Sequence, residues 1–307
     1  MNSINNGPGA AQNGASNGAP APKLFNLPGL VPAWTSDAGA AHTARVSGLP
    51  RGPLSGFPSL DQSMGGCFPR GLSFMHGVPG AGKTALALQI AAQCQCPALF
   101  VTCEMAPVEL LRRHTARVTN TFLGRFKSGE IPLEPSLALL EKAIEAAPGL
   151  HFVDATQAFA GADYLLECAE IVRGDAPHLL IVLDSLHAWA ETIPGSATEY
   201  DSLNLAISML RGVAHRLGAS VLAVCERNRA TMDAGGLSSG AGTRKIEYGA
   251  ELIIDLRRDL TAKQSGAGEV EVRVDLAKNR HGAPGEAARL MFSGALQSFR
   301  EGGGEGK

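Results

Sequence analysis

Short apolar runs alternate with longer segments of helical periodicity from about residue 55 to residue 300. The apolar runs predict strands at Leu72–His76, Ala98–Thr102, His151–Asp154, Leu179–Asp184, Ala219–Cys225 and Leu252–Leu256. Apolar positions three and four residues apart predict helices at Thr84–Cys94, Pro107–Val118, Glu134–Ala147, Ala162–Arg173 and Tyr200–Leu217. Strands that alternate with helices are typical of βαβ units, so the pattern predicts an α/β fold with a mainly parallel central sheet flanked by helices.

A different pattern follows near the C-terminus. Apolar and charged residues alternate in Val270–Leu276, and the apolar run Ala288–Phe292 comes after a Gly-Ala-Pro-Gly turn. This arrangement predicts a C-terminal antiparallel β-hairpin added to the parallel sheet.

Both ends of the chain have a composition that argues against a packed core. Residues 1–22 contain no charged side chain and consist almost wholly of Asn, Gly, Ala, Ser, Pro and Gln. Such a segment cannot bury enough apolar surface to offset the entropy lost on ordering. We therefore expect a disordered leader at residues 1–54, one folded domain at residues 55–300 and a disordered tail at residues 301–307.

The charge balance narrows the classes of function. The chain of 307 residues has 27 Lys and Arg residues against 29 Asp and Glu residues, a net charge of −2. This balance excludes a globally basic nucleic-acid coat and a polybasic membrane anchor. No apolar stretch approaches the roughly 18 residues that cross a bilayer, so we expect a cytoplasmic protein without membrane contact. The six cysteines lack the paired spacing typical of zinc or redox sites.

A glycine-rich stretch lies between the first predicted strand and the first predicted helix. It reads Gly77-Val78-Pro79-Gly80-Ala81-Gly82-Lys83-Thr84, the G-x-x-x-x-G-K-T pattern of a P-loop. Glycines let backbone N–H groups surround phosphates, and the following helix presents its positive end. We expect Lys83 to contact the β- and γ-phosphates of ATP and Thr84 to ligate Mg²⁺.

Two carboxylates are candidates to complete this site. Asp184 ends an apolar strand, where P-loop proteins place the carboxylate that organises the metal; the alternative is an ordinary strand-end residue in a turn. Hydrolysis also needs a base or a water-orienting group near the γ-phosphate. Glu104, which follows the next predicted strand, is a candidate for this group; an equal alternative is that it begins the next helix as a favourable N-terminal charge.

Several segments resemble the RecA-like ATPase core of DnaB-type replicative helicases and RadA-type recombination ATPases, and they follow one another along the chain in the same order as in those families. These segments are Phe57–Gly66, Val101–Met105 with Leu110 and Arg113, Leu183–Leu186, Val221–Arg229 and Ala277–Gly282. The first is similar to the RadA and KaiC lead-in to the P-loop. The last is similar to the Lys-x-Arg pair that DnaB-type helicases insert into a neighbour's nucleotide site. The resemblance implies a RecA-like fold with Glu104 as the general base.

The resemblance also implies that the active unit is a ring or filament, with a hexamer expected. Lys278 and Arg280 would reach the ATP of the adjacent subunit, where a guanidinium neutralises charge on the transferring phosphoryl group. One position departs from the DnaB pattern, because Glu226 stands where those proteins have a glutamine sensor of the γ-phosphate. An ionised carboxylate cannot donate a hydrogen bond, so we expect altered coupling between hydrolysis and loop movement.

A glycine-rich polar loop from residue 229 to residue 245 is flanked by Arg227, Arg229, Arg244 and Lys245. In the families that the chain resembles, the corresponding loop lines the central channel and holds the DNA backbone. Glycine amides and basic side chains suit phosphate contacts, and the lack of aromatic residues predicts backbone-directed binding of single-stranded DNA. The alternative is a disordered surface loop.

These features predict a Mg²⁺-dependent ATPase that acts on DNA as an oligomeric motor, either a helicase in DNA replication or a recombination and repair ATPase. The competing hypothesis is a KaiC-like regulatory or scaffold ATPase whose output is a protein contact. The near-neutral charge and Glu226 favour the regulatory hypothesis. The Lys278 and Arg280 pair and the basic-flanked loop favour the motor.

Overall fold

The computed structural model describes residues 24–196, 198–226, 246, 248–258 and 268–302. The chain divides into two compact units, Met1–Gly48 and Leu49–Lys307. In the first unit the described residues form helix α1 (Leu27–Ser47). The second unit holds the sheet and the other described helices.

Helix α1 lies in the stretch for which the composition predicted no regular structure. The Asn26 side chain accepts a hydrogen bond from the Gly29 N–H at 2.8 Å, and Gly48 ends the helix in the left-handed conformation. These are the usual residue types at the two ends of a helix. No residue of α1 is buried in the described structure. Capping residues are a local signal that overall composition does not reveal, so the helix was not predicted.

The folded domain also begins earlier than the composition predicted. The Phe68 N–H donates to the Pro53 carbonyl at 2.8 Å, and the Leu54 N–H donates to the Cys94 carbonyl at 3.0 Å. Backbone hydrogen bonds thus attach residues 53 and 54 to the domain, which residue composition cannot reveal.

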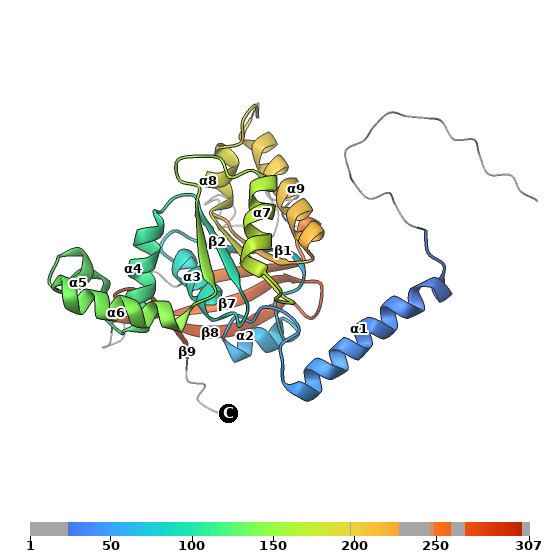
Figure 1. Cartoon of the computed structure of the whole chain (residues 1–307), viewed down its shortest axis with the longest axis horizontal. Helices are drawn as coiled ribbons and strands as arrows, with labels where there is room; N and C mark the ends of the chain where they lie inside the picture. Colours follow the sequence, from blue (N-terminus) through green and yellow to red (C-terminus); the bar gives the residue numbers. More distant parts are fainter. Residues whose placement is uncertain (1–23, 197, 227–245, 247, 259–267, 303–307) are drawn as a thin grey trace, which may run out of the picture. The chain divides into compact units, whose positions relative to one another are not determined.

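The described strands of the second unit form one sheet in the order β3-β2-β4-β5-β1-β6-β7-β8-β9 (Figure 1). Neighbouring strands are parallel from β3 to β6 and antiparallel from β6 to β9. The bounds are β1 Gly71–Gly77, β2 Ala98–Thr102, β3 Leu150–Asp154, β4 Leu180–Asp184, β5 Ser220–Val224, β6 Leu252–Arg258, β7 Glu269–Asn279, β8 Gly285–Ser293 and β9 Ser298–Glu301. The predicted α/β fold with a mainly parallel sheet and a C-terminal antiparallel hairpin is confirmed.

Helices cover both faces of this sheet (Figure 1). Residues of α2, α3 and α4 belong to the apolar core on one face, and residues of α7, α8 and α9 belong to the core on the other. The bounds are α2 Pro58–Ser63, α3 Lys83–Gln93, α4 Pro107–Val118, α5 Leu123–Lys127, α6 Leu133–Ala146, α7 Ala162–Arg173, α8 Leu186–Glu191 and α9 Glu199–Leu217. Of the helices described, none combines the length and the apolar character needed to cross a membrane.

The short strand β9, which the sequence pattern did not predict, pairs with β8 and is also bonded to a buried side chain of α3. Gln89 of α3 is 5% exposed; its Nε2 donates to the Phe299 carbonyl at 2.9 Å and its Oε1 accepts from the Phe299 N–H at 2.8 Å. The Phe299 ring stacks on Phe292 of β8 with 4.4 Å between the ring centroids. Gln89, a polar residue in the otherwise apolar helix α3, therefore connects this helix to the edge strand β9.

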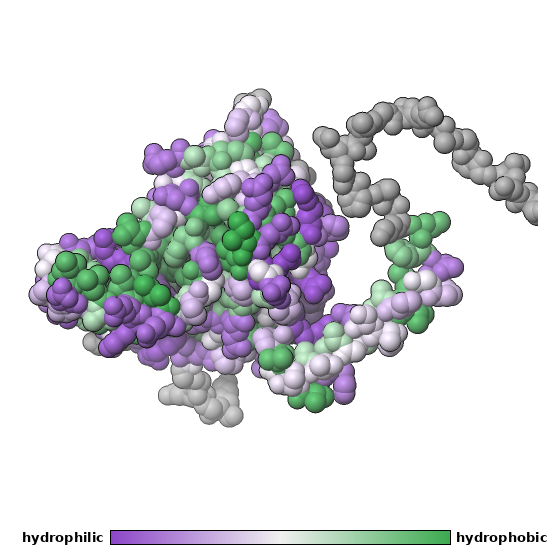
Figure 2. Space-filling model, viewed as in Figure 1, coloured by the Kyte–Doolittle hydropathy of each residue, from purple (hydrophilic) through white to green (hydrophobic). Residues whose placement is uncertain are grey.

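Exposed apolar side chains gather around α5 and α6, where Figure 2 shows a hydrophobic area. They include Phe122, Leu133, Leu137 and Ile144, and we call them the α5–α6 patch. Large exposed apolar patches are typical of protein contact surfaces.

A buried histidine joins α4 to α6. The Nε2 atom of His114 donates to the Ala143 carbonyl at 2.9 Å, and its Nδ1 atom accepts from Arg117 at 3.1 Å. Burial, and then the charge of Arg117, lower the pKa of His114 to about 4. The imidazole is therefore neutral in the folded protein at pH values at which it would be charged in the unfolded chain.

We predict that this histidine makes the fold less stable in acid. A folded-state pKa below the unfolded value of about 6.5 gives stability that is complete above pH 6.5 and is lost as the pH falls toward 4. Urea unfolding should show a loss of about 3 kcal/mol from this group over that range. His114→Gln should remove this part of the pH profile, whereas His151→Gln, at an exposed position, should not. Identical profiles for both variants would contradict the assignment.

Candidate nucleotide-binding and catalytic site

The carboxyl ends of parallel strands bring the predicted site residues together. Met75 of β1, Thr102 of β2, Asp184 of β4 and Val224 of β5 lie in one row across the sheet. The P-loop follows β1 directly, and Glu104 lies two residues beyond the end of β2. The parallel hydrogen-bond register therefore decides which side chains meet at this edge.

The P-loop turns from β1 into α3, as its sequence predicts. Gly80 and Gly82 have φ values of 79° and 91°, a region that side chains rarely adopt. A Cβ atom on Gly82 would also lie 2.7 Å from the Phe299 Cζ atom, so only glycine fits there. The Lys83 ammonium donates to the carbonyls of Gly77 at 2.8 Å and Val78 at 3.3 Å.

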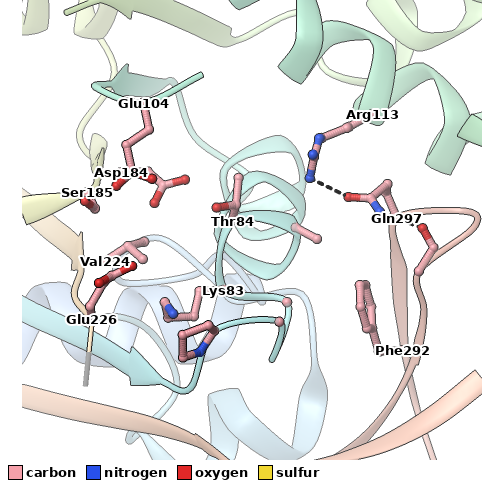
Figure 3. A pocket seen from close by; sticks show the side chains of 15 residues that line it. Lys83, Thr84, Glu104, Arg113, Asp184, Ser185, Val224, Glu226, Phe292 and Gln297 are labelled. Carbon is pink, nitrogen blue, oxygen red and sulfur yellow. Dashed lines mark hydrogen bonds between the residues drawn. The ribbon is translucent and has the colours of Figure 1, made fainter. Parts of the chain in front are cut away.

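These elements surround a cavity of about 390 Å³. Figure 3 shows Glu104, Asp184, Ser185 and Glu226 on one side, Arg113, Gln297 and Phe292 on the other, and Lys83 and Thr84 between them. The cavity thus has carboxylates on one side and Lys83 in the middle. On the other side lie Arg113 and two residues of the antiparallel region, Phe292 and Gln297.

Asp184 is the most buried carboxylate of the cavity, at 8% exposure. Burial raises its pKa to about 6, and the negative charge of Glu104 acts in the same direction. The Thr84 hydroxyl, which hydrogen-bonds to Asp184, and the Lys83 ammonium lower the pKa. A buried carboxylate of this kind favours the binding of a cation.

Glu104 lies between β2 and α4, and α4 begins only at Pro107. The structure therefore differs from the alternative in which Glu104 starts the helix. Its carboxylate accepts a hydrogen bond from the Ser185 hydroxyl and faces the cavity (Figure 3). Glu104 is thus oriented by a neighbour of Asp184, which sequence spacing alone could not establish.

The donor set fits Mg²⁺ bound together with a nucleotide. Among the described residues there is no cluster of three or more His, Cys, Asp or Glu side chains that could hold a metal alone. Thr84 and Asp184 supply two hard oxygen atoms that already hydrogen-bond to each other. Mg²⁺ in nucleotide sites usually takes one or two protein oxygens and completes its shell with phosphate and water, so the residues present suit it.

Arg113, Phe292 and Gln297 line the side of the cavity that faces away from the carboxylates, and the sequence predicted no role for them. Arg113 of α4 donates to the Gln297 Oε1 atom at 2.8 Å, and Phe292 of β8 stacks on Phe299. Phe292 and Gln297 lie more than 200 residues from the P-loop in sequence. They reach the cavity because β8 and β9 extend the sheet beside α3, and no local motif signals this.

Glu226 follows β5 and lines the cavity, and its role as a sensor stays a prediction. Its backbone N–H donates to the His187 Nδ1 atom at 3.4 Å, and its side chain is exposed.

Lys278 and Arg280 do not line this cavity. β6 runs parallel to β1, and Leu256 pairs with Gly77 at the P-loop end. β7 runs antiparallel to β6, so Asn279 pairs with Leu252 at the opposite end. The Lys278 and Arg280 pair therefore lies across the length of the sheet from the P-loop of the same subunit.

A family model described as "DnaB-like helicase C terminal domain" matches residues 52–301. The chain belongs to this family. "Protein RecA" of Picosynechococcus sp. (strain ATCC 27264 / PCC 7002 / PR-6) is 27% identical over 267 residues, which cover 80% of this chain and 65% of that protein. The chain thus spans just under two thirds of that relative.

Two solved structures are similar to this DnaB-like domain. One is described as an "ATPase Domain", with a TM-score of 0.74 and 21% identity over 89% of this chain and 98% of that one. The other is "The Structure Of A DnaB-Like Replicative Helicase And Its Interactions With Primase", with a TM-score of 0.71 and 19% identity over 90% of this chain and 67% of that one. The predicted RecA-like P-loop ATPase core resembling DnaB is confirmed.

The residues predicted to contact DNA lie outside the described part of this DnaB-like domain. They are Arg227, Arg229, Arg244 and Lys245. Their role remains a prediction from the sequence.

We predict that substitutions at Lys83 and Glu104 separate nucleotide binding from hydrolysis. Lys83→Ala removes the charge nearest the P-loop carbonyls and should weaken ATP binding roughly tenfold to hundredfold. Glu104→Gln keeps the shape of the cavity but removes the base, and should lower kcat by about 10²- to 10⁴-fold with unchanged ATP affinity. Nucleotide titration and steady-state turnover measure the two effects. The matched control is Glu134→Gln on the exposed surface of α6; full turnover by the Glu104 variant would disprove its role.

Proposed function

We propose that the chain is a Mg²⁺-dependent ATPase that self-associates into a ring or filament and acts on single-stranded DNA. The observation that carries this proposal is the meeting of Lys83, Thr84, Asp184 and Glu104 in one cavity at the carboxyl ends of parallel strands. This arrangement suits phosphoryl transfer to water, because that reaction needs charge stabilisation and an oriented nucleophile.

In this mechanism the P-loop amides hold the phosphates of ATP, and the Lys83 ammonium exchanges its carbonyl partners for phosphate oxygens. Glu104, oriented by Ser185, accepts the proton of the attacking water. Arg113 adds positive charge on the opposite wall, and the Phe292 ring offers an apolar surface to the nucleotide. When bound to Thr84 and Asp184, Mg²⁺ would neutralise charge on the β- and γ-phosphates.

Self-association is proposed because Arg280 lies at the opposite end of the sheet from the P-loop of its own subunit. If Arg280 has the catalytic role that the resemblance implies, its guanidinium acts on the nucleotide of another copy. A head-to-tail contact of this kind generates a ring or a filament. The α5–α6 patch offers apolar area for such a contact.

DNA is the proposed polymer because the chain belongs to the DnaB-like family and has basic residues on both sides of the glycine-rich loop. A role in DNA replication or in repair is part of this proposal. Glu226 at the sensor position supports the second candidate, a regulatory ATPase that does not move along DNA, because its carboxylate cannot donate a hydrogen bond to phosphate.

We predict that single-stranded DNA raises kcat for ATP and that this effect weakens as salt increases. Phosphate contacts release counterions, so the logarithm of DNA affinity should fall linearly with the logarithm of salt concentration. ATPase assays over a DNA titration at several salt concentrations measure both quantities, with Lys83→Ala as the background control. An ATPase rate that DNA leaves unchanged at low salt would favour the regulatory candidate.

We predict that two inactive variants restore activity when they are mixed. Arg280→Ala leaves its own P-loop intact, and Lys83→Ala leaves its own Arg280 intact, so a mixed assembly contains some complete sites. Each variant alone should lose about 10³-fold in kcat, and co-assembled subunits should regain a measurable part of it. Mixing Lys83→Ala with Glu104→Gln is the control, since both defects lie in the same cavity. If co-assembled subunits stayed as inactive as the separate variants, completion of the site by a neighbour would be excluded.

A further inference from the structure

In the isolated subunit the Arg280 side chain is docked on a short segment just before β6. Its Nη2 atom donates to the Tyr248 carbonyl at 3.0 Å, and its Nη1 atom lies 3.4 Å from the Glu251 Oε1 atom. The Arg280 backbone N–H also donates to the Glu251 carbonyl at 3.1 Å. Three contacts to Tyr248 and Glu251 therefore set the position of the guanidinium.

Glu251 is itself held against the start of β1. Its N–H donates to the Leu72 carbonyl at 2.8 Å. A Cβ atom on Gly71 would lie 2.8 Å from the Glu251 Cγ atom, so the glycine makes room for this side chain. The side chain is 25% exposed, which leaves it few alternative positions. Glu251 is thus held in place by its neighbours, and it pairs with the long, flexible side chain of Arg280.

Arginine and histidine side chains lie around the Glu251 carboxylate. The His281 Nε2 atom lies 3.4 Å from its Oε2 atom. Glu251 also lines a cavity of about 580 Å³ with Arg70, Arg211 and His215. Among the described residues, Glu251 is the one carboxylate that lines this cavity. Removal of its side chain would take away the negative charge that pairs with the Arg280 guanidinium.

We propose that Glu251 is a positioning residue that holds Arg280 in the orientation from which it reaches the nucleotide of a neighbouring subunit. This inference rests on the proposed completion of the site by Arg280. The segment that contacts Arg280 also lies close in sequence to the predicted DNA-binding residues, since Tyr248 comes three residues after Lys245. Because Lys245 is predicted to contact DNA, we propose that the segment from Tyr248 to Glu251 transmits the effect of DNA binding to Arg280.

The first test compares Glu251→Gln and Glu251→Ala with Arg280→Ala and with a matched control. The control is Glu286→Gln, which removes another glutamate that pairs with an arginine, Arg289, at 2.7 Å. Loss of the anchor should lower kcat roughly tenfold to hundredfold, because a small misplacement of a catalytic group has effects of this size. ATP affinity should change no more than it does in Arg280→Ala, since the P-loop of the same subunit is at the other end of the sheet. Glu286→Gln should keep the wild-type kcat.

A double-mutant cycle separates positioning from a purely structural role. If Glu251 acts through Arg280, the double variant Glu251→Ala/Arg280→Ala should be no slower than Arg280→Ala alone. The DNA-dependent increase in kcat should also shrink in both Glu251 variants. If Glu251→Ala does not fold, Glu251→Gln carries the same comparison, because it keeps the size of the side chain.

The outcomes are distinguishable. Full activity of Arg280→Ala would overturn the proposed function of the pair in a neighbour's site. Reduced activity of Arg280→Ala together with wild-type kcat in Glu251→Gln and Glu251→Ala would overturn only the positioning role. Additive losses in the double variant, or a larger change in ATP affinity than Arg280→Ala produces, would also overturn it and indicate a general structural effect.

Discussion

The parallel register of β1, β2, β4 and β5 is the constraint on which the site depends. It places Met75, Thr102, Asp184 and Val224 in one row, and the chain leaves the sheet just beyond that row. The P-loop and the carboxylates of Asp184 and Glu104 can therefore meet although they come from separate parts of the sequence. A shift of one residue in any of these strands would turn every side chain to the other face and dismantle the site.

Electrostatics make this edge of the sheet ready for a charged ligand. Burial of Asp184 beside Glu104 raises the pKa of Asp184, and two nearby carboxylates are stabilised by a cation. Lys83 meanwhile donates to carbonyls of its own loop and stays hydrogen-bonded until a phosphate replaces them. In our proposal, a nucleotide bound with its metal would relieve like-charge repulsion on one side of the cavity and supply an anion on the other.

In our proposal, the antiparallel strands place reacting groups at two ends of the sheet. Because β7 reverses direction beside β6, Arg280 lies far from the P-loop of its own subunit, and Glu251 holds it there. The same strands return to the nucleotide cavity through Phe292 and Gln297. The C-terminal part of the domain therefore contributes to one site directly and, in our proposal, to a second site across a subunit contact.

The parallel half of the fold and the P-loop motif could be read from the amino-acid sequence. Buried strands such as β2 and β4 are continuous apolar runs, and the P-loop motif is local, so both are visible without coordinates. Three relations became visible only in the folded chain: Glu104 lies beside Asp184, Phe292 and Gln297 line the opposite side of the cavity, and Glu251 pairs with Arg280. These relations depend on strand register and on contacts between distant residues, which no local pattern encodes. Helix α1 was missed for the opposite reason, because its capping signals are local but its composition resembles that of a disordered segment.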